Sequence, residues 1–241
     1  IFIGADAGTV NATGNGHIRC IHLGDYAGFQ LSKGATGATS IDKASPDVIS
    51  IGYTANYNTT LTKRTISIGA YANSNSILSI NNVNVGISAS MAASGSNNVS
   101  IGTEAGYSSI GSYDINIGAA AGYDSNNDRT VCIGTNAGAY TVTSSYNIIM
   151  GDTAGYGLNG TSMTAIIGQD AGRYITGSME CVAFGRQAMY SASYCLQTTA
   201  IGYDAGFGLG RSVESPSGRH RPITGSTFVG ALAGSGSHDL K

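Results

Sequence analysis

The chain has 241 residues, and its 12 lysines and arginines against 14 aspartates and glutamates give a formal net charge of −2. Without a basic surplus the chain cannot neutralise phosphates, so we expect no nucleic-acid partner. Hydrophobic residues make up 41% of the chain, which excludes a disordered protein at so low a net charge. No apolar run approaches the ~20 residues of a membrane-spanning helix. Glycine, at 36 residues, is about twice as frequent as usual, and this richness points to a repeat.

The pattern apolar-x-apolar-Gly-x-x-Ala recurs along the whole sequence. It reads IFIGADA at the start and VSIGTEA near the middle. Alanine follows each repeat glycine by three residues, and nine of the twelve spacings between repeat glycines are 16 or 17 residues. The repeat glycines are Gly4, Gly24, Gly52, Gly69, Gly86, Gly102, Gly118, Gly134, Gly151, Gly168, Gly185, Gly202 and Gly230. Chance would not place an alanine three residues after every one of these glycines, so the pattern is a true sequence repeat.

In chain order, the repeats form one repetitive domain over residues 1–241. Residues 1–47 contain the N-terminal repeats and an insertion, and residues 48–207 contain the regular repeats. Residues 208–241 contain a second insertion and the last repeat. A polar residue such as Asn82 or Asn98 opens most repeats, and such residues hydrogen-bond their own backbone at turns.

Each repeat predicts one short β-strand immediately before its glycine. Ile66, Ser67 and Ile68 are typical, because two β-branched residues flank a small polar one. This alternation predicts a strand with one buried face. We therefore expect the two flanking apolar residues and the repeat alanine to form the core, and the glycine to adopt a conformation closed to other residues.

A period of 16 or 17 residues is too short for helical repeats of ~33–47 residues or for propeller blades of ~40 residues. It fits one coil of a β-solenoid with one or two short strands. The predicted fold is therefore all-β: a repetitive β-solenoid or β-roll of about thirteen coils, stacked ~4.8 Å apart.

The small coil predicts association, because it encloses only a thin core. In the second half of the chain the middle strand residue also becomes apolar, as at Cys132, Ile149 and Ile166. Both faces of those strands then require burial. We expect an obligate oligomer in which partner chains cover the second face; local variation within a monomeric solenoid is the alternative.

The string SIGxxA followed by NxxIGxxAG resembles the repeats of two related settings. One is the head region of trimeric autotransporter adhesins, with NSVAIG-type coils; the other is the shaft or receptor-binding region of bacteriophage tail fibres, with IGxxA repeats. The resemblance covers residues 1–234. It implies a homotrimer of parallel β-rolls, outside the cell or on a virion, that binds a receptor. The longer, tyrosine-rich coils favour the phage fibre.

Many repeats place an aromatic residue five positions after the glycine. Equal phase in a solenoid predicts one stacked column, whose rings and hydroxyls could bind sugars; a structural ladder is the alternative. These residues are Phe29, Tyr57, Tyr107, Tyr123, Tyr156, Tyr190 and Phe207. Of these we assign Tyr107, Tyr123, Tyr156 and Tyr190 to a candidate receptor-binding site.

Two insertions, residues 30–47 and 208–226, break the period. Insertions in repeat arrays become loops on one face and often carry binding. The second contains Arg211, Arg219, His220 and Arg221 against one acid, Glu214. This basic cluster is a further candidate for receptor binding, for example to an acidic polysaccharide, and a solvated loop is the alternative.

Catalytic and metal sites find little support in the sequence. Asp170 and Asp204 share a phase two coils apart, a separation of about 9.6 Å at ~4.8 Å per coil. This lies at the edge of the range for a carboxylate pair that cleaves polysaccharide. The histidines are scattered and no Cys-x-x-Cys pair occurs, so we expect no metal, no cofactor and no enzyme. Cys132 reads as a small buried hydrophobe.

These observations predict a structural and receptor-binding segment of a trimeric bacteriophage tail fibre. The expected partners are two further copies of the chain, a host-surface polysaccharide or outer-membrane receptor, and other fibre or baseplate proteins. The alternatives are the head of a trimeric bacterial adhesin and a purely architectural shaft. An ice-binding solenoid needs a regular threonine column, which Thr54, Thr103, Thr135 and Thr153 do not form.

Overall fold

The computed structural model describes residues 1–9, 17–30, 45–210 and 223–236. Within these ranges the chain is all-β, has no helix, and forms a parallel β-solenoid of about ten turns. The predicted fold class is thereby confirmed; the exact number of coils and the trimer stay predictions. The chain divides into two compact units, Ile1–Asp124 and Ser125–Lys241.

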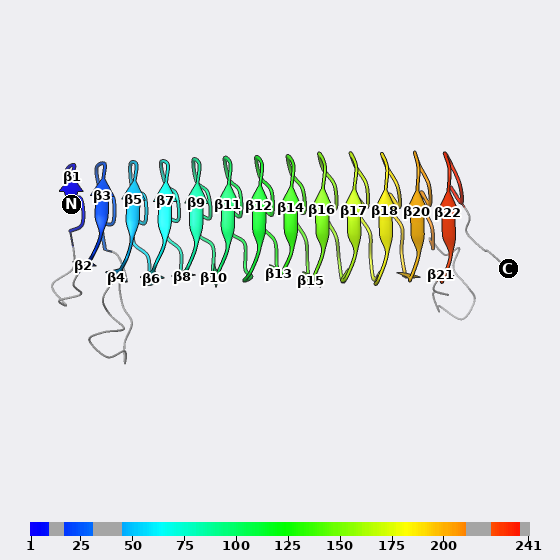
Figure 1. Cartoon of the computed structure of the whole chain (residues 1–241), viewed down its shortest axis with the longest axis horizontal. Helices are drawn as coiled ribbons and strands as arrows, with labels where there is room; N and C mark the ends of the chain where they lie inside the picture. The colour runs from blue at the N-terminus through cyan, green and yellow to red at the C-terminus, as the bar shows by residue number, and fades with distance from the viewer. Residues whose placement is uncertain (10–16, 31–44, 211–222, 237–241) are drawn as a thin grey trace. The chain divides into compact units, whose positions relative to one another are not determined.

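In the first unit, one short strand from each coil pairs in parallel with the strand of the next coil (Figure 1). The pairing keeps the repeat in register, so that Ser50 lies opposite Ser67 and Ile51 opposite Ile68. The strands, in sheet order, are β1 (Phe2–Ile3), β3 (Ile21–Leu23), β5 (Ile49–Ile51), β7 (Ile66–Ile68), β9 (Val83–Val85), β11 (Val99–Ile101) and β12 (Ile115–Ile117).

The second unit repeats this arrangement. Cys132 lies opposite Ile149, and Ile149 opposite Ile166, so equivalent residues again stack in columns. The strands, in sheet order, are β14 (Val131–Ile133), β16 (Ile148–Met150), β17 (Ala165–Ile167), β18 (Val182–Phe184), β20 (Thr199–Ile201) and β22 (Thr227–Val229).

Shorter strands form narrower parallel ladders later in each coil. In the first unit these are β2 (His17–Ile18) with β4 (Ser45–Pro46), and β6 (Leu61–Lys63), β8 (Leu78–Ile80) and β10 (Gly95–Ser96). In the second they are β13 (Asn127–Asp128) with β15 (Ser144–Ser145), and β19 (Cys195–Leu196) with β21 (Ile223–Thr224).

A ribbon of tight turns follows each repeat glycine. Its backbone enters the left-handed region at alternate residues, as at Glu104 (φ 58°) and Gly106 (φ 63°). The Glu104 N–H donates to Ile87 O at 2.9 Å in the preceding coil, and the Gly106 N–H donates to Ala121 O at 2.8 Å in the following coil. Neighbouring coils thus satisfy the backbone groups that a short turn would otherwise leave unpaired.

The repeat glycine is required by both conformation and space. Gly102 has φ 136°, and a β-carbon added to it would lie 2.5 Å from the carbonyl oxygen of Gly118 in the next coil. Any other side chain would therefore push neighbouring coils apart, which explains the invariance of glycine at this phase.

The strand faces are the reverse of those we predicted. The middle residue points into the coil, where Ser67 and Ile149 are fully buried together with every repeat alanine from Ala27 to Ala205. The flanking residues lie outside, and Ile68 is 37% exposed. The prediction that they form the core is wrong, because a three-residue strand has only one inward position and the turn ribbon covers that position.

The interior of the first unit is polar. Asn56 lies at its centre, donating to Ser50 Oγ at 2.7 Å and accepting from Ser67 Oγ at 3.0 Å and from Asn73 Nδ2 at 2.6 Å. All four side chains are buried. The second unit has an apolar interior instead, built from buried residues such as Ile149, Leu158, Ile166, Ile175 and Met189.

Polar residues that open the repeats form a second buried ladder at the corner before the strand. Asn98 Nδ2 donates to Gly111 O at 2.8 Å, and its Oδ1 accepts from the Asp114 N–H at 2.9 Å. Asn82 accepts in the same way from the Asn98 N–H at 2.9 Å. We predicted that these residues bond to their own turn, but their hydrogen bonds reach backbone groups 13 or 16 residues away and so join one coil to the next.

Candidate functional site

An aliphatic face covers the outside of the main strands in each unit. It consists of the first and third residues of each strand, and all of them are half-buried or exposed. In the first unit these residues are Ile49, Ile51, Ile66, Ile68, Val83, Val85, Val99, Ile101, Ile115 and Ile117. In the second unit the aliphatic face includes Val131, Ile133, Ile148, Met150, Ile167, Val182, Phe184 and Ile201.

The area of the aliphatic face follows from the strand geometry. With strands about 4.8 Å apart and about 10 Å long, each unit presents roughly 300 Å² before side-chain relief is counted. This area is comparable to the largest apolar patch on a typical monomeric protein, and such a patch is often functional. The aliphatic face is not the one we expected partner chains to cover: we assigned that role to the middle strand residues such as Cys132 and Ile149, and these are buried inside the coil.

Several aromatic residues five positions after the repeat glycine stack face to face, as predicted. The ring centroids of Tyr107 and Tyr123 are 5.0 Å apart with planes at 6°, and those of Tyr190 and Phe207 are 5.1 Å apart at 5°. Each ring therefore covers a face of its neighbour. The rings of these half-buried pairs therefore have less surface to offer a ligand than exposed rings have.

Around Tyr156 the column departs from simple stacking, because Arg173 takes the aromatic position of the next coil. The Arg173 guanidinium carbon lies 5.1 Å from the centre of the Tyr156 ring and 5.0 Å from that of Tyr174. Tyr174 meets Tyr156 and Tyr190 edge to face, with centroids 5.8 and 6.0 Å apart. The cationic group is thus held between two aromatic faces.

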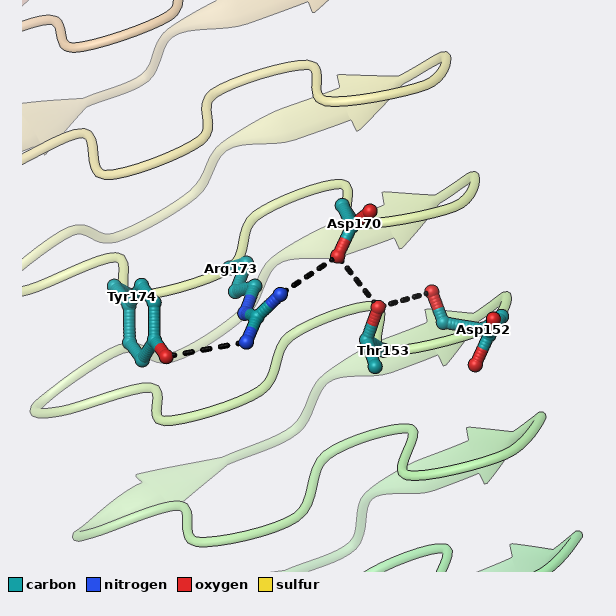
Figure 2. Close-up of polar contacts among 5 residues, drawn as sticks. All are labelled: Asp152, Thr153, Asp170, Arg173 and Tyr174. Atoms are coloured by element: carbon teal, nitrogen blue, oxygen red, sulfur yellow. Dashed lines mark hydrogen bonds and ion pairs between the residues drawn. The ribbon is translucent and has the colours of Figure 1, made fainter.

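A polar network ties this cationic group to two successive coils, as Figure 2 shows. Arg173 Nη1 donates to Asp170 Oδ1 at 3.1 Å and Nη2 donates to Tyr174 Oη at 3.2 Å. Thr153 Oγ1, in the preceding coil, lies 2.6 Å from Asp170 Oδ1 and 2.8 Å from the backbone oxygen of Asp152. We call Thr153, Asp170, Arg173 and Tyr174 the Arg173 cluster.

The Arg173 cluster keeps its charges. Partial burial lowers the pKa of Arg173, but hydrogen bonds to Tyr174 and Asp170 outweigh this and leave that pKa above its ordinary value. Asp170 accepts two hydrogen bonds on one oxygen, from Thr153 Oγ1 and Arg173 Nη1.

A second aromatic group lies in the first unit. Tyr53 contacts Tyr26 and Tyr71 edge to face, with centroids 6.2 and 5.5 Å apart, and all three rings are exposed. Phe29 and Tyr57 stack behind them at 5.3 Å.

A shallow hollow of about 280 Å³ in the second unit is lined by Met179, Glu180, Leu196, Gln197 and Thr224. Gln197 Nε2 donates to Glu180 Oε2 at 3.0 Å across it. The Gln197 amide and the Glu180 carboxylate are thus hydrogen-bonded to each other, and the rest of the lining is mainly apolar.

The remaining predicted site residues divide into two groups. Arg211, Arg219, His220 and Arg221 lie outside the described residues. For the carboxylate pair, Asp170 is engaged in the Arg173 cluster, whereas Asp204 has one buried oxygen without a hydrogen-bond partner.

The described residues contain no group of three or more His, Cys, Asp or Glu side chains that could hold a metal ion. Cys20, Cys132, Cys181 and Cys195 are free and buried. The prediction that Cys132 acts as a small buried hydrophobe is confirmed.

Comparison with known proteins adds no relative. No protein-family model matches the chain, and no curated protein matches its sequence significantly. Over the described residues, no helix is long and apolar enough to cross a membrane. Functional inference therefore depends on the aliphatic face and the Arg173 cluster.

Sequence reasoning missed most of the Arg173 cluster. Asp170 was singled out for another role, Thr153 was named only among the threonines that form no regular column, and Arg173 and Tyr174 were not named. A signal was available, because Asp170 and Arg173 are three residues apart in a chain with only 11% charged residues. Arg173 also interrupts the aromatic phase between Tyr156 and Tyr190, and a charge in an aromatic column requires a partner.

Proposed function

We propose that the chain is a structural and receptor-binding segment of a trimeric fibre, of the kind found in bacteriophage tail fibres. The aliphatic face is the observation that carries this proposal. Rows of isoleucine and valine on the outside of a parallel sheet are costly in water, at about 25 cal/mol per Å² of exposed apolar surface. Association of copies removes this cost, since every copy presents the same face.

A cyclic trimer would cover the aliphatic face of each unit. Three identical chains can pack these residues against one another and leave their turn ribbons outside. Closed cyclic symmetry also buries the apolar surface of every copy. An open, head-to-tail arrangement would leave this surface exposed at its ends and would keep adding copies. Three copies would then present three identical binding sites, and avidity would compensate for weak single contacts.

The Arg173 cluster and the neighbouring tyrosines support the receptor-binding part of the proposal. They belong to the turn ribbon, on residues other than those of the aliphatic face, so association leaves them accessible. The alternatives are the head of a trimeric bacterial adhesin, which differs in setting rather than in surface chemistry, and a purely architectural shaft, which would bind no receptor.

Light scattering of the purified chain tests the association. We expect a β-rich particle of about three chain masses. Ile101→Lys and Ile148→Lys, which place a charge on the aliphatic face of either unit, should reduce this mass. Ile110→Lys is the matched control, because Ile110 is 60% exposed but lies outside the main strands. A stable, monodisperse monomer of the unmodified chain would refute the trimer.

A further inference from the structure

We propose that the Arg173 cluster and Tyr140, whose ring centroid lies 5.3 Å from that of Tyr156, form a binding site for an uncharged glycan. The inference rests on the proposed receptor-binding function and names the class of receptor. It assigns binding to the exposed residues Tyr140 and Tyr174 and to the Asp170 carboxylate, rather than to the half-buried stacked tyrosine pairs.

The ring surfaces come from Tyr140 and Tyr174, which are 45% and 43% exposed. Both stand six residues after a repeat glycine, and Gly157 holds the same position in the coil between them. A β-carbon on Gly157 would lie 2.9 Å from Tyr174 Cδ1, so glycine is what allows the ring to lie over this backbone. Exposed aromatic rings of this kind stack on the apolar faces of sugar rings.

The hydrogen-bonding groups come from Asp170 and Arg173. Both donors to Asp170, Thr153 Oγ1 and Arg173 Nη1, bind its Oδ1, and Oδ2 accepts no hydrogen bond from any described residue. A free carboxylate oxygen beside exposed rings is an acceptor for sugar hydroxyls, and hydrogen bonds to a charged acceptor are stronger than neutral ones. The side chain of Asp170 retains 16% exposure, so this oxygen is within reach.

The charge balance favours an uncharged glycan over an acidic one. Arg173 is already paired with Asp170 at 3.1 Å, so its charge is neutralised within the cluster. An acidic sugar would also meet the carboxylates of Asp170 and, in the preceding coil, Asp152 (Figure 2), and like charges repel. Hydroxyl groups carry no such penalty.

Calorimetric titration of the assembled chain with soluble polysaccharides tests the proposal. The probes are neutral glucan, mannan and galactan, with polygalacturonate as the acidic counterpart. We expect binding of at least one neutral polymer, and at least tenfold weaker binding for Tyr174→Ala and Asp170→Asn. Tyr71→Ala is the matched control, because Tyr71 is 40% exposed and edge to face with Tyr53 in the first unit.

Three results would overturn the inference: binding of the acidic polymer alone, no binding of any neutral polymer, or equal losses for Tyr71→Ala and Tyr174→Ala. Circular dichroism and light scattering of each variant separate a lost site from a lost fold. A trimer that attaches to cells but ignores neutral glycans would refute this inference alone. A monomer that binds them would refute the trimer and leave the inference standing.

Discussion

Gly172 lies directly beside the side chain of Ile166, six residues before it in the same coil. A β-carbon on Gly172 would be 2.8 Å from Ile166 Cδ1. Gly155 has the same relation to Ile149, and Gly138 to Cys132. At Ser50 the strand residue is small and its partner is larger, and Asn56 fills the space with a hydrogen bond of 2.7 Å. In these coils the strand residue and the residue six positions later share one interior slot.

Exchange of the two slot residues tests this sharing. Gly172→Asn should destabilise the chain by several kcal/mol, because the amide collides with Ile166 while asparagine tolerates the left-handed backbone. Ile166→Ser alone should cost about 2–5 kcal/mol as a buried deletion. The double variant recreates the Ser50–Asn56 pair, so its cost in thermal or denaturant unfolding should fall clearly below the sum of the two. An additive cost would refute the shared slot.

Alanine substitutions at two repeat glycines allow the cost of backbone strain to be measured apart from the cost of a steric collision. Gly202 and Gly230 have φ of 134° and 120°, and a β-carbon on Gly202 would lie 2.5 Å from Gly230 O, while one on Gly230 would meet nothing within 4 Å. Gly230→Ala should then cost only the strain, about 1–3 kcal/mol. Gly202→Ala should cost clearly more in denaturant unfolding. Equal costs would mean that the neighbouring coil yields freely.

The polar interior of the first unit predicts a large effect for one amide. Asn56→Ala should destabilise the chain by about 2–4 kcal/mol, because the partners of Asn56 would be left buried and unpaired. Asn58→Ala is the control, since Asn58 pairs with Asn75 at 3.1 Å on the exposed side of the coil. Its effect on the free energy of unfolding should stay at about 1 kcal/mol, which is the cost of alanine in the left-handed backbone that both asparagines adopt, at φ 54° and 52°. Similar losses for both variants would contradict the assigned role of Asn56.

The buried thiol of Cys195 predicts a loss of stability in alkali. Burial raises the pKa of Cys195 from 9.0 to about 12. Between these values the unfolded chain releases the proton and the folded chain keeps it, so the stability present below pH 9 falls as the pH rises, by about 1.4 kcal/mol per pH unit. Cys195→Ala should unfold with a shallower pH dependence over this window. Identical pH profiles for the two chains would show that the thiol is not protected.

The sequence predicted the coil but not its inside and outside. The phase of glycine and alanine was enough for the strands, the corners and the solenoid, because a repeat averages out local ambiguity. The alternation of apolar and polar residues, however, defines the two faces of each strand without showing which face packs inside the coil and which lies on its outer surface. Ile66 and Ile68 look like core residues, and Ser67, which is fully buried, looks like a surface residue. The assignment reverses because Asn56 satisfies that serine, which only the folded coil reveals.

The site was predictable only in part. The stacking of Tyr107 on Tyr123 followed from their common phase. The Arg173 cluster did not, because it depends on Thr153 in the preceding coil reaching Asp170, and on the direction in which a long guanidinium group turns. In a turn ribbon with left-handed residues at alternate positions, the direction of each side chain does not follow a simple sequence period such as that of a strand or a helix.

Register between coils has a consequence for how such a chain can change over generations. Since Ser50 pairs with Ser67 and Ser67 with Asn84, each coil offers its neighbour the same pattern of donors and acceptors. Loss or duplication of one whole period would rejoin equivalent positions and leave every hydrogen-bond ladder continuous, whereas loss of a few residues would shift all later columns. Deletions or duplications in the gene can therefore change the length of this segment by whole coils without disrupting the packing between the coils that remain.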